Sequence, residues 1–250
     1  MCGICGCTEE DGHSGVHEHH HEHSGSAEHL VQIEQNILAK NDQYAEENKR
    51  SFLQKNILAL NMMSSPGSGK TTLLAKTIDD LRSIIDVAVV VGDQQTDLDA
   101  RKIQDSGGTA IQINTGKVCH LDAHRVGHAV EKLPLQKQSI LIVENIGNLV
   151  CPALFNLGEH YKIVILSVTE GDNKPLKYPD MFHAADLLVI TKTDLLPYVD
   201  FDLAQCKQYA LRINPKLDIL SLSSKSGEGL QEWYEWLNTK LLGLVSLKKM

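Results

Sequence analysis

The stretch NMMSSPGSGKTTLLAK (Asn61–Lys76) decides the fold, because it joins an apolar run to a helix-like segment through a turn rich in glycine and serine. Gly67 and Gly69 allow backbone N–H groups to curl around phosphate oxygens. Lys70 is placed to reach the β- and γ-phosphates of a nucleotide, and the Thr71 hydroxyl is placed to hold Mg²⁺. The positive end of the helix that begins near Lys70 adds to this attraction. The stretch therefore predicts a phosphate-binding loop between a strand and a helix.

The loop departs from the pattern G-x-x-x-x-G-K-[ST] at one position, where Ser64 replaces the first glycine. Serine tolerates fewer backbone conformations than glycine, so we expect a slightly less permissive turn there. A glycine-rich turn that binds nothing is the alternative interpretation, and the strand–loop–helix context of GSGKTT argues against it. The nucleotide contacts predicted in the loop are Gly67, Ser68, Gly69, Lys70, Thr71 and Thr72.

Seven short apolar runs alternate with helix-like stretches through the body of the chain. The runs lack strict alternation of apolar and polar residues, which is typical of strands covered on both faces in a parallel sheet. This pattern predicts an α/β fold with a mostly parallel sheet of about seven strands flanked by helices, and ligands at the carboxyl ends of the strands. The expected strands lie within residues 56–63, 86–93, 109–115, 139–145, 161–168, 186–194 and 217–223.

Two late segments favour guanine as the base of the nucleotide. VITKTDLL is similar to the motif N-K-x-D, in which Asp194 would accept hydrogen bonds from the guanine N1 and amine, and the Lys192 stem would lie over the ring. Thr191 replaces the usual asparagine, which predicts weaker support for the phosphate loop. SLSSKSGEGL offers backbone N–H groups of Ser224 and Lys225 to the guanine O6. The alternative to guanine binding is a structural role, in which Lys192 and Asp194 are a Lys/Asp pair that closes the start of a helix. GTP is the predicted nucleotide, and the fold is predicted to be a P-loop GTPase.

Two acids at strand ends are candidates for handling Mg²⁺ and water. Asp93 ends the run VVVGD, and Glu144 ends the run LIVE, with Gly147 three residues further on. The Gly147 N–H would touch the γ-phosphate and respond to its loss. Buried acids at strand ends can also be structural. The predicted catalytic set is Lys70, Thr71, Asp93 and Glu144.

A second group of residues suits a soft or borderline metal ion. Cys119 and His120 follow the carboxyl end of one expected strand, and Cys151 lies four residues after Gly147. Two thiolates and an imidazole are suitable ligands for Zn²⁺ or Ni²⁺ and leave one position open. Free cysteines often serve as small core residues, which is the alternative. His124 and His128 follow at helical spacing, either as supporting or as surface groups.

The amino-terminal segment has a composition of its own. Residues 1–27 are poor in large apolar residues, so we expect a disordered tail in the absence of a ligand, followed by a helical linker at 28–53 and the GTPase domain at 54–250. The thiolates of Cys2, Cys5 and Cys7 form a candidate nickel site. A purification tag or a solubilising tail is the alternative. Weaker accessory nickel ligands are His13, His17, His19, His20, His21 and His23.

Charge and hydropathy exclude several classes of protein. Of the net charge of −8, the first 50 residues contribute most, with ten acidic and three basic residues against 22 and 21 in the remainder. The nearly neutral body lacks the basic face of a nucleic-acid binder. No apolar run is long enough to span a membrane, and the amino terminus lacks the pattern of a secretory signal. We therefore expect a cytoplasmic protein without a nucleic-acid or membrane partner.

These motifs together resemble the HypB family, the nickel-inserting GTPases of hydrogenase maturation. The resemblance spans the whole chain, and the segments that carry it are M-C-x-x-C-G-C at Met1–Cys7, S-P-G-S-G-K-T at Ser65–Thr71, G-D-Q-Q-T-D at Gly92–Asp97, N-T-G-K-x-C-H-L-D-A at Asn114–Ala123 and E-N-x-G-N-L-V-C-P at Glu144–Pro152. The resemblance implies a GTPase that dimerises around its nucleotide. It also implies delivery of Ni²⁺ to the [NiFe]-hydrogenase large subunit, together with a small zinc- and nickel-binding partner protein.

The resemblance also implies roles for particular residues. It places tight nickel binding at the amino-terminal cysteines, and nickel or zinc at Cys119, His120 and Cys151 on the dimer interface. It places Asp99 in a switch segment of the nucleotide site. The alternatives are a nickel-storage protein with a vestigial nucleotide site, a urease accessory GTPase and a partitioning-type ATPase. Storage needs neither Lys70 nor Asp194, and both are present.

Overall fold

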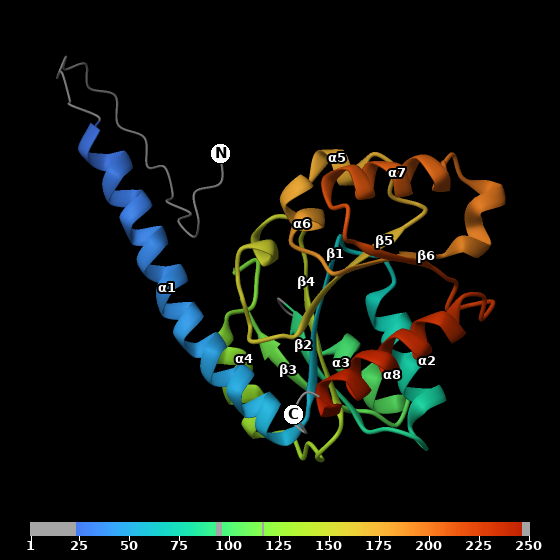
Figure 1. Cartoon of the computed structure of the whole chain (residues 1–250), viewed down its shortest axis with the longest axis horizontal. Coiled ribbons are helices and arrows are strands. Elements are labelled where there is room, and N and C mark those ends of the chain that lie inside the picture. Colours follow the sequence, from blue (N-terminus) through green and yellow to red (C-terminus); the bar gives the residue numbers. More distant parts are fainter. Residues whose placement is uncertain (1–23, 94–96, 117, 247–250) are drawn as a thin grey trace. The chain divides into compact units, whose positions relative to one another are not determined.

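The computed structural model of the chain describes residues 24–93, 97–116 and 118–246. It falls into two compact units, Met1–Lys40 and Asn41–Met250. Helix α1 (Ser24–Lys55) extends beyond both ends of the linker predicted at 28–53 (Figure 1), and the boundary between the two units falls within it. The cysteines and histidines predicted to bind nickel in the tail lie outside the described residues.

The second unit contains a single seven-stranded sheet whose strand pairs are all parallel, as predicted. The spatial order of the strands is β3-β2-β4-β1-β5-β6-β7, so the strand that leads into the phosphate loop lies at the centre (Figure 1). The strands are β1 (Leu58–Ser64), β2 (Val87–Asp93), β3 (Thr109–Asn114), β4 (Ile140–Gly147), β5 (Tyr161–Ser167), β6 (Leu187–Thr191) and β7 (Asp218–Ser221).

Helices cover both faces of the sheet. Apolar residues of α2, α3 and α8 pack on one face, and those of α4, α6, α7 and the end of α1 pack on the other. Two short 3₁₀ segments, η1 (Cys151–Ala153) and η2 (Thr193–Tyr198), follow β4 and β6. The helices are α2 (Lys70–Leu81), α3 (Leu98–Asp105), α4 (Ala123–Glu131), α5 (Lys174–Lys177), α6 (Pro179–His183), α7 (Leu203–Ile213) and α8 (Leu230–Ser246).

The residues of β1 show why this sheet is buried on both sides. Every residue of the strand is buried. Successive side chains of a strand point to opposite faces. Accordingly, Leu58, Leu60 and Met62 belong to the core under α2 and α8, whereas Ala59 and Met63 belong to the cores on the other face. Because both faces need apolar residues, the strand is apolar except at Asn61 and Ser64, and its hydrophobic pattern has no two-residue period.

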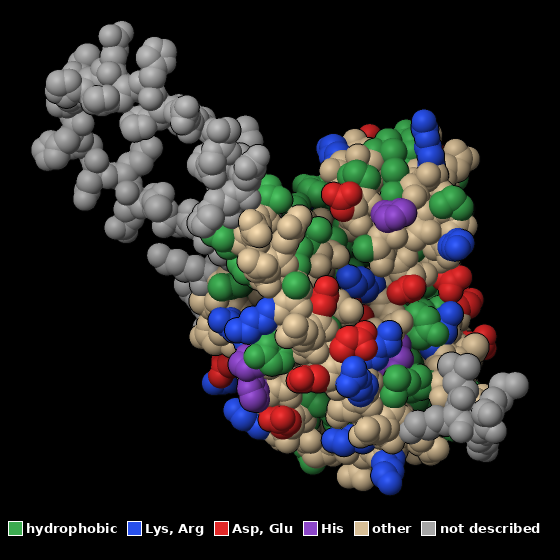
Figure 2. Space-filling model, turned by 60° about the vertical axis from the view of Figure 1, so that its left-hand side comes forward, with side chains coloured by type: hydrophobic (Ala, Val, Ile, Leu, Met, Phe, Trp, Pro, Cys, Tyr) green, Lys and Arg blue, Asp and Glu red, His purple; other side chains and the backbone are tan. Residues whose placement is uncertain are grey.

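The outer surface shows mixed charge. On the face drawn in Figure 2, acidic and basic side chains are interspersed, without a broad basic field. None of the helices that the structure describes combines the length and apolar character that crossing a membrane requires.

Parallel strands bring distant segments to one edge of the sheet. The carboxyl ends of β1, β2, β4 and β6 carry the phosphate loop, Asp93, the segment from Glu144 to Gly147, and Lys192. Gly147 pairs with Ser64, and an added Cβ at Gly147 would approach Pro66 atoms to 2.8–2.9 Å. The β4 end therefore lies directly against the phosphate loop.

Candidate nucleotide site and metal cluster

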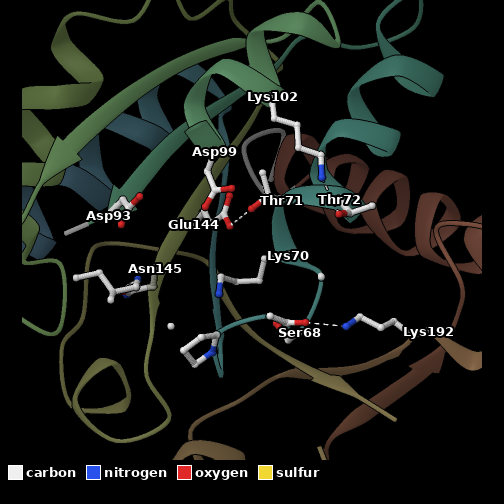
Figure 3. A pocket seen from close by; sticks show the side chains of 16 residues that line it. Ser68, Lys70, Thr71, Thr72, Asp93, Asp99, Lys102, Glu144, Asn145 and Lys192 are labelled. Carbon is white, nitrogen blue, oxygen red and sulfur yellow. Dashed lines mark hydrogen bonds between the residues drawn. The ribbon is translucent and has the colours of Figure 1, made fainter. Parts of the chain in front are cut away.

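A cavity of about 510 Å³ opens at this edge of the sheet (Figure 3). It contains most of the residues predicted for the phosphate and magnesium site. Lining residues that the sequence did not single out include Pro66, Lys102 and Asn145, of which Lys102 comes from α3 and Asn145 from β4. The predicted residues that line it are Gly67, Ser68, Gly69, Lys70, Thr71, Thr72, Asp93, Asp99, Glu144, Gly147 and Lys192.

The phosphate loop is held by hydrogen bonds centred on Ser64. This buried hydroxyl accepts hydrogen bonds from Lys70 Nζ and from Ser68 Oγ, each at 2.6 Å, and donates to the Ser65 carbonyl at 2.6 Å. Gly67 and Gly69 adopt φ values of +74° and +98°, which glycine reaches without steric cost. Ser64 keeps a negative φ, so the missing glycine does not distort the turn. Its hydroxyl instead holds the Lys70 ammonium inside the loop.

Glu144 is a strongly perturbed acid of the cavity. Its Oε1 accepts a hydrogen bond from Thr71 Oγ1 at 2.7 Å, and its buried Oε2 has no hydrogen-bond partner among the described residues. Burial raises the pKa of Glu144 to about 7, although the Thr71 hydroxyl and the Lys70 ammonium act in the opposite direction. Burial also lowers the pKa of Lys70, against the attraction of Glu144 and Asp99. A buried carboxylate oxygen without a partner fits a site completed by a cation.

Oxygen ligands around Glu144 suit Mg²⁺, which prefers carboxylate, hydroxyl and phosphate oxygens. Thr71 and Glu144 are directly hydrogen-bonded, and Asp93 and Asp99 line the same cavity (Figure 3). Lys102 reaches across from α3 and donates to Thr72 Oγ1 at 2.8 Å. This bond spans 30 residues of sequence, so no local pattern predicts it.

A second cavity, of about 250 Å³, lies beside the phosphate loop. The predicted guanine contacts Lys192, Asp194, Ser224 and Lys225 all line it. Asp194 Oδ1 accepts a hydrogen bond from Ser223 Oγ at 2.6 Å, and the same Ser223 oxygen accepts from the Lys225 N–H at 3.2 Å. Ser223 therefore positions both the carboxylate and the loop, a role that was not predicted although Ser223 directly precedes the predicted guanine contacts Ser224 and Lys225.

Thr191 supports the phosphate loop directly. Its Oγ1 donates to the Ser68 carbonyl at 2.6 Å, and Lys192 Nζ donates to the Gly67 carbonyl at 2.7 Å. The support expected to weaken without asparagine at this position is therefore present, because the threonine hydroxyl reaches the loop. Lys192 adopts φ of +60°, an uncommon conformation that directs the chain from β6 into η2.

The predicted metal ligands meet where the loop after β3 approaches the segment that follows β4. Among the described residues, Cys119, His120 and Cys151 form a group whose ligand atoms all lie within 4.8 Å of one another. The two sulfur atoms are 3.0 Å apart, and neither cysteine forms a disulfide. Burial lowers the pKa of His120, whose ring stacks on Phe155, and this favours the neutral imidazole that binds metals. Two sulfurs and one imidazole nitrogen leave a fourth tetrahedral position open.

Two asparagines join this cluster to the nucleotide cavity. Asn145 Oδ1 accepts from the Leu121 N–H at 3.3 Å, and Asn145 also lines the nucleotide cavity. Asn148 Nδ2 donates to the Cys119 carbonyl at 3.3 Å, and its Oδ1 accepts from the Val150 N–H at 2.9 Å. The segment from Glu144 to Cys151 is thus attached to the loop from Cys119 to Leu121 at successive points.

A phosphate loop after β1, acids after β2 and within β4, and a base cavity after β6 define a P-loop protein of the GTPase type. Comparison with known proteins shows to which family within this class the chain is related. Residues 58–221 match the family model described as CobW/HypB/UreG, nucleotide-binding domain. The hydrogenase maturation factor HypB of Rhizobium leguminosarum bv. viciae is 57% identical over 212 residues, which cover 85% of this chain and 71% of that protein. The HypB of Escherichia coli K12 is 50% identical over 211 residues, 84% of this chain and 73% of that protein.

Solved structures of HypB proteins are also similar to this chain. The crystal structure of HypB from Helicobacter pylori in complex with nickel has a TM-score of 0.78 and 42% identity, covering 82% of this chain and 96% of that one. HypB from Archaeoglobus fulgidus has a TM-score of 0.76 and 38% identity, covering 82% of this chain and all of that one. The chain belongs to the HypB family of hydrogenase maturation factors.

Proposed function

We propose that this protein is a GTP-hydrolysing nickel metallochaperone, in which the state of the nucleotide controls a metal site on the same domain. The observation that carries the proposal is the segment Glu144–Cys151. It contributes a carboxylate to the nucleotide cavity at one end and a thiol to the metal cluster at the other. The nickel-bound relative from Helicobacter pylori supports Ni²⁺ as the ion.

Hydrolysis is assigned to the residues of the larger cavity. The backbone N–H groups of the glycine-rich turn and the Lys70 ammonium bind the β- and γ-phosphates and stabilise the charge that develops during transfer. Thr71, Asp93 and Glu144 would hold Mg²⁺, which neutralises phosphate charge when it is bound. Asp99 completes the acidic side of the cavity. On leaving Ser64, the Lys70 ammonium exchanges one hydroxyl partner for phosphate oxygens.

Selection of the base is assigned to the smaller cavity. Asp194 accepts hydrogen bonds from the guanine N1 and amine, and the N–H groups of Ser224 and Lys225 would donate to O6, for which the Lys225 N–H exchanges its present acceptor, Ser223 Oγ. The Ser223 hydroxyl fixes Asp194 in advance. Adenine presents an acceptor at N1 and has no amino group at C2, so it cannot donate two hydrogen bonds to the carboxylate as guanine does.

Transfer of nickel completes the proposed cycle. Cys119, His120 and Cys151 hold Ni²⁺ or Zn²⁺ in a homodimer formed around nucleotide, and Cys2, Cys5 and Cys7 supply a tighter nickel site with the tail histidines as weaker ligands. The ion passes to the [NiFe]-hydrogenase large subunit in the cytoplasm, with the help of a small zinc- and nickel-binding maturation partner. The family name of the relatives, hydrogenase maturation factor, supports this destination.

The alternative of a nickel store without enzymatic activity is tested by changing Lys70. Lys70→Ala should reduce GTP turnover by at least about a hundredfold, because a buried ammonium that stabilises transferred charge is lost. Nickel bound per chain should stay the same, since Lys70 contacts no proposed nickel ligand. Lys76→Ala is the matched control, because Lys76 lies on the same helix and pairs with Asp80 at the surface. Turnover by Lys70→Ala equal to that of the control would support the storage function.

A further inference from the structure

Two histidines on α4 form a pair that neither the nucleotide cavity nor the cysteine cluster uses. His124 and His128 are four residues apart on the solvent side of the helix. Their Nε2 atoms lie 3.1 Å from each other, and their rings meet edge to face with centroids 4.5 Å apart. Helical spacing alone places such side chains on one face, but it does not require their nitrogens to converge.

The separation of the nitrogens matches what a single metal ion needs. Bonds of about 2.0–2.1 Å from a borderline metal to two imidazole nitrogens place those nitrogens about 2.9 Å apart at a right angle and about 3.4 Å apart at a tetrahedral angle. The observed 3.1 Å lies between these values.

A hydrogen bond at Nδ1 of the His128 ring leaves Nε2 of the same ring available to bind a metal. His128 Nδ1 lies 3.2 Å from Glu131 Oε2, so the Nδ1–H donates to the carboxylate and the Nε2 lone pair is left for a ligand. Without a metal, that lone pair accepts the Nε2–H of His124. When a metal binds, neutral His124 takes the tautomer that carries its single proton on Nδ1, so that the Nε2 lone pairs of both rings are available to the ion.

The helix that carries the pair is firmly anchored. The Asp122 side chain caps its first turn by accepting from the Arg125 N–H at 2.9 Å. Asn48 of α1 donates to the Ala123 carbonyl at 2.8 Å, and the Tyr44 ring packs 4.6 Å from that of His124. Because the backbone is already ordered, binding an ion costs little beyond fixing two side chains.

We propose that His124 and His128 form a chelating site for a borderline divalent cation, Ni²⁺ or Zn²⁺, with water at the remaining positions. Imidazole nitrogens suit these ions and not Mg²⁺ or Ca²⁺. The His128 and Glu131 side chains are 60% and 73% exposed, so an ion reaches the pair directly from solvent. Metal binding at this site depends only on these side chains. The proposal therefore does not depend on whether the protein hydrolyses GTP.

The test measures metal protection of each histidine in the full chain at pH 7.5. Diethyl pyrocarbonate acylates free imidazole nitrogen, and a nitrilotriacetate buffer fixes free Ni²⁺ so that binding elsewhere in the chain does not deplete it. Trypsin cuts after Arg125 and Lys132, so a single peptide reports His128 alone. His183 is exposed, is the single histidine of its own tryptic peptide, and serves as a one-imidazole reference in the same digest.

His128 should become protected at a free Ni²⁺ concentration roughly tenfold or more below that needed for His183, because the second imidazole acts at high effective concentration. His124→Gln should shift the His128 curve to that of His183, whereas His183→Gln should leave it in place. Coincident curves for His128 and His183 in the unmodified chain would overturn the proposal. So would a His128 curve that His124→Gln does not move.

Discussion

At the scale of single residues, Glu144 shows how the nucleotide site reduces the stability of the fold around it. The carboxyl group is almost fully buried, and one of its oxygens has no partner among the described residues. Burial raises its pKa, the Thr71 hydroxyl and the Lys70 ammonium oppose this effect only in part, and Asp99 acts in the same direction as burial. A pKa raised from 4.5 to about 7 means that ionised Glu144 is held at a cost until a cation arrives.

This cost should appear as a pH dependence of folding. Between pH 4.5 and about 7 the folded chain binds a proton at Glu144 that the unfolded chain has released, so the free energy of unfolding falls as pH rises through this window. Glu144→Gln keeps an acceptor for Thr71 and removes the ionisation. The nucleotide-free variant should match the unmodified protein near pH 4.5 and exceed it by up to about 3 kcal/mol above pH 7. Urea unfolding at several pH values measures this, and a difference that does not change with pH would contradict the assignment.

Asp194 carries the prediction for base selection. Asp194→Asn replaces the acceptor for the guanine amine by an amide donor, which suits the oxygen of xanthine at that position. GTP affinity should fall by roughly tenfold or more, and xanthosine triphosphate should become the preferred nucleotide. Competition binding with both nucleotides measures the preference, and an unchanged order would place the base elsewhere. Ser224→Ala is a suitable control, because its predicted contribution is made by its backbone N–H.

At the scale of elements, the end of β4 and the loop after β3 are held together by side-chain hydrogen bonds. Asn148 bridges them through the Cys119 carbonyl, while its own turn is closed by the Val150 N–H. Gly147 lies against Pro66 of the phosphate loop. A displacement of Gly147 when the γ-phosphate leaves should therefore pull on Cys119 through Asn148 as well as on Cys151 through the chain.

Asn148→Asp tests the hydrogen bond that links the end of β4 to the loop after β3. Aspartate keeps the acceptor for the Val150 N–H and removes the donor to the Cys119 carbonyl. The ratio of nickel affinities between the GTP-analogue and GDP states should move toward one, while GTP affinity stays the same. Asn156→Asp is a matched control, because its Oδ1 also closes a local turn, by accepting from the Gly158 N–H at 2.9 Å. A ratio unchanged by Asn148→Asp would show that coupling passes through the chain alone.

The elements also show which features a sequence can predict. The strands were predictable because strands covered on both faces are largely apolar, as in β1, and because GSGKTT has a local chemical meaning. The meeting of Cys119 and Cys151, which are 32 residues apart, followed from the rule that parallel strands end at one edge. Ser223, Lys102 and Asn148 were not predicted, since their roles depend on side-chain contacts across the fold that no spacing reveals.

At the scale of the whole molecule, the Asn41–Met250 unit contains both the nucleotide cavities and the cysteine cluster. A ligand at one site can affect the other only if the two states of the protein bind it differently, and the effect is reciprocal. We therefore predict a coupling free energy between γ-phosphate and metal, carried by the β4 end.

The most direct measurement is the nickel affinity of the Cys119/His120/Cys151 site in the two nucleotide states. The measurement uses the whole chain with Cys2, Cys5 and Cys7 changed to serine. This variant lacks the competing thiolates of the tail, so nickel–thiolate absorption reports nickel binding at the Cys119/His120/Cys151 cluster. Titrations under buffered Ni²⁺, with a non-hydrolysable GTP analogue and with GDP, should give affinities that differ roughly 5- to 150-fold, which is a coupling of about 1–3 kcal/mol. Equal affinities in the two states would contradict the account.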